Sequence, residues 1–203
     1  MKRGALSGVV LAGGQSRRMG QDKASMAWGS TTLLEHVLQT LRPVVGELIV
    51  SAKDEAPFGH LSVAVVKDRV VDGHALGGVY SSLLSISYDR CFVCACDTPF
   101  LNRSLVEYLI QQSTEVDAVV PTSKRGIEPL CAVYSKSFLP ILKECVDQKE
   151  WSLKKAIDRG NSRILSIQEV RRFDPEELSF LNVNTPKEYF QAASRQEDLR
   201  CSA

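Results

Sequence analysis

The feature that most constrains the fold of this 203-residue chain is a regular alternation of short apolar runs with longer amphipathic segments. The apolar runs are rich in β-branched residues and apolar on both faces, as expected for parallel strands covered by helices on both sides. The segments between them have helical periodicity, since Leu34, Val37, Leu38 and Leu41 recur at spacings of three and four before Pro43. We therefore predict an α/β fold, a mostly parallel sheet with helices on both faces, in a single domain.

The second part of the chain has a more irregular pattern. A polar segment, SKRGIEP, precedes a predicted strand, LCAVY, and a predicted helix, SKSFLPILKECVDQ, that Pro140 interrupts. A short helix, WSLKKAIDRG, is expected to close at Gly160, and RILSI is a further strand. Thr185 is predicted to cap the last helix, with Pro186 as its first residue. We divide the single domain into a first part of about 5–121, a second part of about 122–195 and a flexible tail of about 196–203.

Positive charge is concentrated near the start of an almost neutral chain. The 25 Lys and Arg residues and 24 Asp and Glu residues give a net charge of +1, which argues against nucleic acid or a membrane surface as partner. No apolar stretch reaches the roughly 18 to 20 residues of a membrane span, and no signal-peptide pattern is present, so we expect a cytoplasmic protein. Residues 1–23 nevertheless carry five cations against one acid, Asp22, which predicts a local anion. The five cations are Lys2, Arg3, Arg17, Arg18 and Lys23.

A glycine-rich loop, GGQSRRMG, directly follows the first predicted strand. Its glycines permit a tight turn and let backbone N–H groups approach a phosphate. The adjacent glycines do not match GxGxxG, and Gly20 is followed by Gln21 instead of the lysine of a Walker A loop. A basic surface loop would have the same composition. The position at the carboxyl end of a parallel strand, where α/β folds bind ligands, favours a phosphate site.

Three of the six cysteines lie in CFVCACD, an apolar run predicted to be a buried strand. Strand alternation directs Cys94 and Cys96 to one face and Cys91 to the other, which is a poor arrangement for a metal chelate. We predict buried, reduced thiols.

The same strand is followed by Asp97, after which Thr98 and Pro99 turn the chain. A carboxylate in this place costs desolvation energy unless a cation or hydrogen bonds accompany it. One alternative is that Asp97 caps the helix that begins near Arg103, but Asn102 is better placed for that role. We therefore predict that Asp97 binds a metal ion.

The segment LAGGQSRRMGQDKA resembles the signature motif of the molybdenum cofactor guanylyltransferases. These enzymes belong to the wider family of nucleotidyltransferases that share a Rossmann-like sheet. CDTPFL resembles the same family's CDxPFL, whose aspartate binds the Mg²⁺ that bridges the nucleotide phosphates, so the resemblance implies that Asp97 holds Mg²⁺. It also implies that Lys23 and Arg18 contact the phosphates and act with Asp97 in catalysis. The loop residues that would contact the nucleotide through their backbone are Leu11, Ala12, Gly13 and Gly14.

Further stretches extend the resemblance from about residue 6 to about residue 190. VVKDRVVDGHALGGVYSSLL resembles the family's aspartate followed by GPLAGI, which makes Asp68 a nucleotide contact, although HALGGV lacks the proline. Ser51 lies where some relatives have an asparagine that contacts the guanine nucleotide. In IEPLCAVY, Glu128 replaces the histidine of the family's HPLCALY.

FLNVNTPKEY resembles the family's F-x-N-[IV]-NTPEDL. The resemblance implies that Asn182 and Asn184 lie on the pterin side of the site. For Asn184 and Thr185 an arrangement that only caps the last helix is an equal alternative.

These matches imply a GTP:molybdopterin guanylyltransferase. The terminal phosphate of the molybdenum-molybdopterin cofactor would attack the α-phosphorus of Mg·GTP and expel pyrophosphate, without a covalent intermediate. Because both reactants are anionic, catalysis would consist of positioning and charge neutralisation. The expected partners are GTP, the molybdopterin cofactor, and molybdoenzymes or cofactor-insertion chaperones that receive the product.

Three alternatives stay open at this point. A sister enzyme would transfer CMP to the same pterin, but its usual motif would be LAAG, whereas this chain has LAGG. A sugar-phosphate nucleotidyltransferase would generally be longer. A non-catalytic nucleotide- or cofactor-binding delivery module would have no need of Asp97 and Lys23 together.

Overall fold

The computed structural model of the chain describes residues 6–13, 23–70 and 74–201, without the side chains of Lys23 and of residues 197–201. Most of its strands form one eight-stranded sheet, and two short strands form a separate hairpin. The strands of the large sheet are β1 (Ser7–Leu11), β4 (Glu47–Ala52), β5 (Ala64–Lys67), β6 (Arg90–Ala95), β7 (Ala118–Ser123), β8 (Gly126–Ile127), β9 (Cys131–Ser135) and β10 (Ser162–Leu165). The hairpin strands are β2 (Ala27–Trp28) and β3 (Thr31–Thr32).

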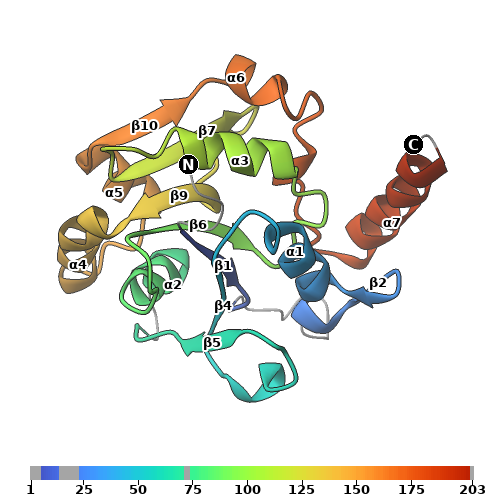
Figure 1. Cartoon of the computed structure of the whole chain (residues 1–203), viewed down its shortest axis with the longest axis horizontal. Helices are drawn as coiled ribbons and strands as arrows, with labels where there is room; N and C mark the ends of the chain where they lie inside the picture. The colour runs from blue at the N-terminus through green and yellow to red at the C-terminus, as the bar shows by residue number, and fades with distance from the viewer. Residues whose placement is uncertain (1–5, 14–22, 71–73, 202–203) are drawn as a thin grey trace.

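The strand order of the large sheet is β10-β7-β9-β6-β1-β4-β5, with β8 paired to β7 (Figure 1). β1 runs parallel to β4 and β6, β4 runs parallel to β5, and β10 runs parallel to β7. β9 is antiparallel to both of its neighbours, β6 and β7. A short connection through β8 joins β7 to β9, and short connections suit antiparallel pairs because parallel pairs need long crossovers. The predicted mostly parallel sheet is confirmed, with β9 as its reversed strand.

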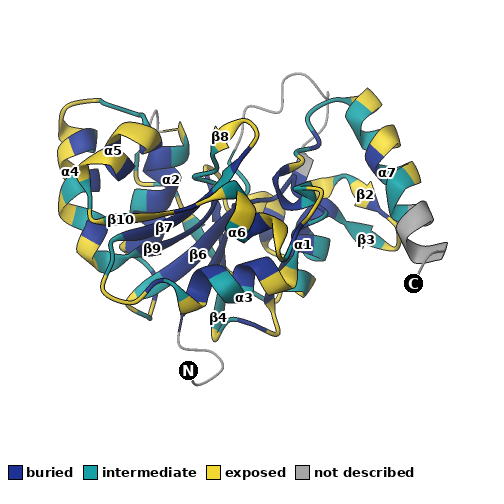
Figure 2. Cartoon of the chain, turned by 90° about the horizontal axis from the view of Figure 1, so that it is seen from above, coloured by how far each residue is buried: buried dark blue, intermediate teal, exposed yellow. Residues whose placement is uncertain are grey.

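Helices cover both faces of this sheet, as predicted (Figure 2). One face packs against α1, α3 and α6, and the other face packs against α2, α4 and α5. The helices are α1 (Leu33–Leu41), α2 (His74–Leu83), α3 (Arg103–Gln111), α4 (Leu139–Asp147), α5 (Leu153–Arg159), α6 (Ile167–Arg171) and α7 (Pro186–Cys201). Val9 and Val10 of the central strand β1 are both fully buried, one in each of the two core layers. Burial on both faces explains why this strand is apolar without alternation.

The cysteines are distributed between the two core layers as strand alternation predicts. Cys94 and Cys96 lie in the layer of α1 and α3, whereas Cys91 lies in the layer of α2 and α4. All three are buried thiols outside disulfides, and burial raises the pKa of Cys94 well above its usual range, which keeps the thiol protonated. No group of three or more potential metal-ligating side chains occurs within the described ranges.

The helix boundaries follow local capping chemistry. Asn102 caps α3 as predicted, since its side chain accepts a hydrogen bond from the Leu105 N–H at 3.1 Å. The predicted interruption at Pro140 is corrected: a 3-10 helix, η4 (Lys136–Phe138), precedes α4, and Pro140 lies in the first turn of α4. A proline is tolerated there because the first N–H groups of a helix have no intrahelical partner.

Gly160 ends α5 as predicted, but for a different reason. Its backbone is extended (φ −91°, ψ 167°) and not left-handed. A Cβ atom at this position would lie 2.8 Å from a carbon of the buried Phe138 ring. Close packing against Phe138 therefore explains the glycine.

The last helix, α7, lies at one end of the molecule beside the β2–β3 hairpin (Figure 1). Its Tyr189 hydroxyl donates to the Ala27 carbonyl at 2.6 Å, and the Tyr189 ring packs edge-on against Trp28. Thr185 caps the helix as predicted, accepting from the Glu188 N–H at 3.2 Å. α7 continues to Cys201, so the segment expected to form a tail from about residue 196 is helical up to that residue.

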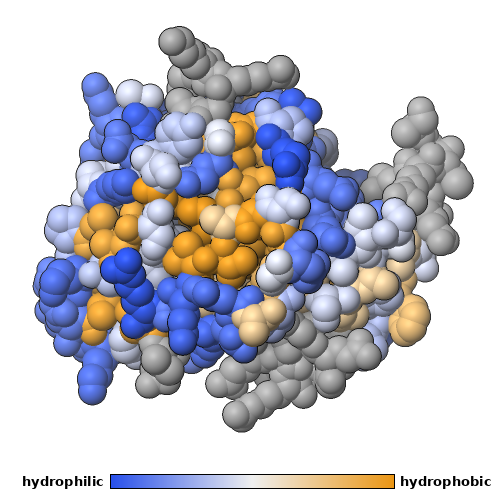
Figure 3. All heavy atoms as spheres, turned by 60° about the horizontal axis from the view of Figure 1, so that its bottom comes forward, coloured by the Kyte–Doolittle hydropathy of each residue, from blue (hydrophilic) through white to orange (hydrophobic). Residues whose placement is uncertain are grey.

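β5 forms one edge of the sheet, at the bottom of Figure 1. β5 pairs with β4 alone among the described strands, and Figure 3, which brings this edge forward, shows an apolar area framed by hydrophilic side chains. Among the described residues, no helix is both long and apolar enough to cross a membrane.

Candidate active site

The carboxyl ends of β1, β4, β5 and β6 meet at one edge of the sheet because these neighbouring strands are parallel. The chain proceeds from β1 outward to β4 and β5, then returns to β6 on the other side of β1. Such a reversal of strand order creates a crevice at the carboxyl ends, which is where open α/β sheets bind ligands. The predicted site residues Gly13, Ser51, Asp68 and Asp97 lie at or directly beyond these strand ends.

Backbone hydrogen bonds fix the start of the glycine loop between β4 and β6. The Ala12 N–H donates to the Ser51 carbonyl at 2.8 Å, and the Cys96 N–H donates to the Leu11 carbonyl at 3.1 Å. Of the residues predicted to follow, Gly14 and Arg18 lie outside the described residues. Lys23 begins the 3-10 helix η2 (Lys23–Ser25), and its side chain lies outside the description.

Gly13, Ser51 and Asp68 come together at the ends of three strands. The Ser51 hydroxyl donates to Oδ1 of Asp68 at 2.5 Å. A Cβ atom on Gly13 would lie 3.2 Å from Oδ2 of Asp68 and 3.6 Å from Cγ of the exposed Lys53. The absence of a side chain at Gly13 therefore lets the loop pass close to the Asp68 carboxylate. Lys53 was missed in the sequence analysis, although its place just after β4 was a usable signal.

Asp97 is the most buried acid at this edge, with 7% of its surface exposed. Its Oδ1 accepts a hydrogen bond from the side-chain amide of Asn182 at 2.9 Å, and its backbone carbonyl accepts from the Val183 N–H at 2.9 Å. Two separate contacts thus hold the chain segment around Asn182 against Asp97. Asn182, predicted only for the far side of the site, lies in direct contact with the predicted metal ligand.

A pocket of about 550 Å³ opens on the other side of Asn182. Its walls come from the β7–β8 turn, from the segment around the 3-10 helix η5 (Leu178–Phe180), and from α7. Both signs of charge line it, which suits a polar ligand better than an apolar one. Lining residues include Lys124, Arg125, Phe180, Asn182, Gln191 and Arg195.

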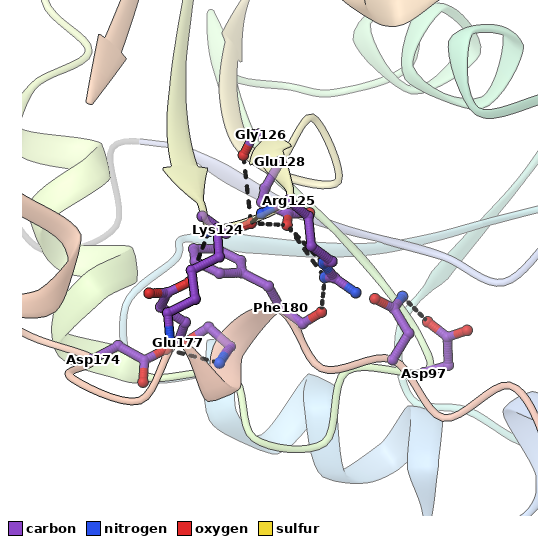
Figure 4. Close-up of polar contacts among 11 residues, drawn as sticks. Asp97, Lys124, Arg125, Gly126, Glu128, Asp174, Glu177 and Phe180 are labelled. Carbon is purple, nitrogen blue, oxygen red and sulfur yellow. Dashed lines mark hydrogen bonds and ion pairs between the residues drawn. The ribbon is translucent and has the colours of Figure 1, made fainter. Parts of the chain in front are cut away.

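The β7–β8 turn is linked to η5 by two polar contacts (Figure 4). The Lys124 N–H donates to the Glu177 carboxylate at 2.9 Å, and the Arg125 guanidinium donates to the Phe180 carbonyl. Arg125 also donates to Oε1 of Glu128, at 3.2 Å from Nη2. The polar segment SKRGIEP does not by itself mark Arg125, because Phe180, which its guanidinium contacts, lies 55 positions away.

The chain is similar over most of its length to proteins of one enzyme family. The family model of the MobA-like NTP transferase domain matches residues 8–164. The chain is 33% identical to a probable molybdenum cofactor guanylyltransferase of Pelotomaculum thermopropionicum, over 96% of this chain and 95% of that protein. The chain belongs to the molybdenum cofactor guanylyltransferase family.

Two further likenesses agree with this family. A probable molybdenum cofactor guanylyltransferase of Methanosarcina mazei is 34% identical, over 91% of this chain and 88% of that protein. The crystal structure of molybdopterin-guanine dinucleotide biosynthesis protein A from Archaeoglobus fulgidus superposes with a TM-score of 0.81 at 25% identity, covering 98% of this chain and all of that one. The guanylyltransferase fold therefore extends over nearly the whole chain.

One departure of HALGGV from the similar family motif, Gly77 in place of alanine, has a packing explanation. A Cβ atom on Gly77 would lie 3.2 Å from both Cβ and the carbonyl oxygen of Val70, and one on Gly78 would lie 3.3 Å from Cδ2 of Leu11. Both glycines thus let α2 approach its neighbours, Gly77 toward the segment after β5 and Gly78 toward the last residue of β1. His74, where the motif has glycine, adopts a positive φ of 47°.

The residues around Asp97 suit a metal ion of the kind that nucleotidyltransferases use. A carboxylate is a hard oxygen ligand, and Mg²⁺ is commonly bound through one or two carboxylates together with substrate phosphates and water. The described residues offer no complete all-protein cage, and Asp97 is the acid closest to full burial at this strand edge. The site therefore fits a metal that arrives with a nucleotide.

Asn184 lies at the start of α7, where its N–H donates to the Glu188 carboxylate at 2.7 Å. Together with the bond from the Glu188 N–H to Thr185, this contact forms the capping arrangement that was one of its two predicted roles.

Proposed function

We propose that the chain transfers GMP from GTP to the terminal phosphate of the molybdenum-molybdopterin cofactor and releases pyrophosphate. The observation that carries this proposal is the meeting of Gly13, Asp68 and Asp97 at one sheet edge, in a chain of the guanylyltransferase family. A nucleotide-transfer site needs an acid that could hold a metal, an acid beside the glycine loop, and a glycine that allows close approach.

Each predicted residue has a role in this proposal. Asp97 would hold Mg²⁺, which when bound supplies neutralisation of phosphate charge. The backbone of residues 11–14 would contact the nucleotide, and Arg18 and Lys23 would bind the phosphates that leave as pyrophosphate. Asp68, oriented by Ser51, would orient the nucleotide.

The pterin substrate would occupy the pocket beside Asn182, within the second part of the chain, about residues 122–195. Support comes from its position, because Asn182 lies both in the pocket lining and on Asp97. Lys124 and Arg195 supply cations for the pterin phosphate, and Asn184 would add a polar contact at the same end. The product would then pass to molybdoenzymes or to cofactor-insertion chaperones.

A binding panel with GTP, CTP, ATP and UTP, each with Mg²⁺, tests the nucleotide. A ligand at about 100 times its dissociation constant adds about 2.7 kcal/mol to the free energy of unfolding. For a chain of this size we expect GTP to raise the melting temperature by about 5 to 10 °C. A shift with CTP and none with GTP would support the cytidylyltransferase alternative instead.

Pyrophosphate release in the presence of the molybdenum-bound pterin tests catalysis separately. We expect one pyrophosphate for each GMP transferred. GTP binding without any transfer would support the non-catalytic delivery module.

A further inference from the structure

We propose that Arg125 and Glu128 together form a positioning unit that holds Asn182 against Asp97. This inference rests on the proposed function, since Asp97 and Asn182 are placed there in the reacting site. Neither member of the unit touches Asp97 in the described contacts. The unit acts through the backbone of the segment that carries Asn182.

The chain segment that carries Asn182 is held on both sides of that residue. The Arg125 guanidinium donates to the carbonyl of Phe180, two residues before Asn182. The Val183 N–H donates to the carbonyl of Asp97, one residue after Asn182. Asn182 thus lies between two anchors, one on the β7–β8 turn and one at the end of β6.

Arg125 is itself held in place by hydrogen bonds to Glu128 and Ser123. Oε1 of Glu128 accepts from Nε of Arg125 at 3.4 Å and from Nη2 at 3.2 Å. The same oxygen accepts from the Ser123 hydroxyl at 2.6 Å, and the Ser123 oxygen accepts from the Arg125 N–H at 3.0 Å. Ser123 and Glu128, on either side of the β7–β8 hairpin, therefore determine where the Arg125 guanidinium points (Figure 4).

The exposure of the Arg125–Glu128 pair indicates a role in geometry and not in stability. The Arg125 side chain is 61% exposed and that of Glu128 is 19% exposed. A pair so accessible to water contributes little to stability as an ion pair. Its geometry is more informative, because a planar guanidinium can bind a carboxylate and a carbonyl at once and hold both in fixed relative positions.

Glu128 is a departure from the similar family motif. Glu128 stands where the similar family motif HPLCALY has a histidine, so this chain has a carboxylate acceptor at the base of the turn. A carboxylate accepts from a hydroxyl and a guanidinium at the same time. Glu128 and Arg125 are accordingly best tested as partners.

The test compares four variants with the full-length enzyme: Arg125→Ala, Glu128→Ala, Glu128→Gln and Arg103→Ala. Arg103 forms an exposed ion pair with Glu107 within α3, not with the segment that carries Asn182, and is the matched control. Steady-state transfer is measured with GTP and the molybdenum-bound pterin, and melting temperatures are recorded for every variant.

We expect Arg125→Ala and Glu128→Ala to lower kcat about tenfold, with both KM values within about twofold, because small displacements of reacting groups are costly. Glu128→Gln keeps an acceptor oxygen and should recover most of the loss, and Arg103→Ala should behave as the wild type. A raised KM for the pterin at unchanged kcat in Arg125→Ala would overturn the proposal, since Arg125 would then be a substrate contact. Unchanged kcat and KM in both alanine variants would also overturn it.

Hydrogen exchange at the Val183 amide supplies a readout that does not depend on activity. We expect faster exchange in Arg125→Ala and Glu128→Ala than in Arg103→Ala, because the contact of Arg125 with the Phe180 carbonyl is lost or weakened. If the wild type transfers no GMP but this exchange difference is observed, the proposed function fails and the positioning unit stands. Equal exchange in all three variants would overturn the positioning unit whatever the activity.

Discussion

The hydroxyl of Ser51 donates a hydrogen bond to Oδ1 of Asp68 at an oxygen-to-oxygen distance of 2.5 Å, and so joins the ends of β4 and β5. The second carboxylate oxygen of Asp68 faces Gly13. Ser51 therefore orients the acid toward the glycine loop.

The first prediction concerns this pair. Ser51→Ala and Asp68→Asn should each weaken GTP binding about tenfold, and the double variant should lose little more, because contacting residues are coupled. Calorimetric titration of the two single variants and the double variant measures the coupling. Ser137→Ala is the matched control, since Ser137 donates to Asp117 at the same 2.5 Å away from the site. Fully additive losses would contradict the orienting role.

The second prediction concerns Asp97. Asp97→Ala should reduce transfer at least about 100-fold, as removal of an electrostatic catalytic group does, with the fold retained. Asn182→Ala should have a smaller effect, about tenfold, because it leaves the carboxylate in place. Transfer rates and melting temperatures are compared with those of Asp158→Ala, at an exposed position of α5. An active Asp97→Ala enzyme would exclude the metal assignment.

The third prediction concerns acid stability. The backbone N–H of Thr32 and then its hydroxyl donate to Glu35, which lowers the pKa of that carboxyl from 4.5. A lowered pKa in the folded state means stability that is present above about pH 4.5 and is lost as the pH falls through the folded value. Glu35→Gln should cost about 1 kcal/mol at pH 7 and flatten the decline of unfolding free energy between about pH 5 and 3. Urea unfolding across this range, with Glu107→Gln as control, measures the difference; equal slopes would contradict the capping role.

The fourth prediction concerns the end of α4. Lys149 has a φ of 55°, and the Lys149 and Glu150 N–H groups donate to Val146 and Cys145 in the pattern of a Schellman cap. Glycine adopts this conformation without strain, so Lys149→Gly should stabilise the fold by about 0.5 to 1 kcal/mol. Lys149→Ala keeps the Cβ atom and should bring no such gain. Thermal or urea unfolding distinguishes the two variants.

The fifth prediction concerns Gly160, where a substitution should lower the free energy of unfolding. Gly160→Ala places a methyl group 2.8 Å from the buried Phe138 ring and should destabilise the fold by about 1 to 3 kcal/mol. Gly126, which has open space around its Cβ position, does not provide a control because its φ of 113° strains any side chain. Gly59, whose Cβ would have a carbonyl oxygen at 3.9 Å as its nearest neighbour, is the suitable comparison. Equal effects of Gly160→Ala and Gly59→Ala would contradict the packing explanation.

Local patterns were enough to predict most of the fold. Strand runs such as GVVL and CFVCAC, and the Asn102 and Thr185 caps, depend on neighbouring residues alone, and the structure confirms them. The reason for Gly160 could not be predicted, because Phe138 is 22 positions away and only the folded chain brings the two together. The reversed direction of β9 also follows from chain connections that periodicity does not encode.

The candidate site was predicted in parts. Asp97, Asp68 and Gly13 could be assigned because each follows a recognisable strand and lies in a family motif. The contact between Asn182 and Asp97 could not, because it depends on how η5 is held by Arg125 and Glu128 from a turn that the sequence marks only as polar. Arg18 and Gly14 lie outside the described residues, and their roles stay predictions.

The bond between Asp97 and Asn182 joins residues 85 positions apart. During synthesis, a ribosome adding about 5 to 20 residues per second needs roughly 4 to 17 s between the two. A nascent chain therefore carries the glycine loop and both acids of the site, Asp68 and Asp97, well before the amide that contacts Asp97 exists. Translation that stops before residue 182 would release a chain in which Asp97 lacks this neighbour, so completion of the site depends on synthesis of the later part of the chain.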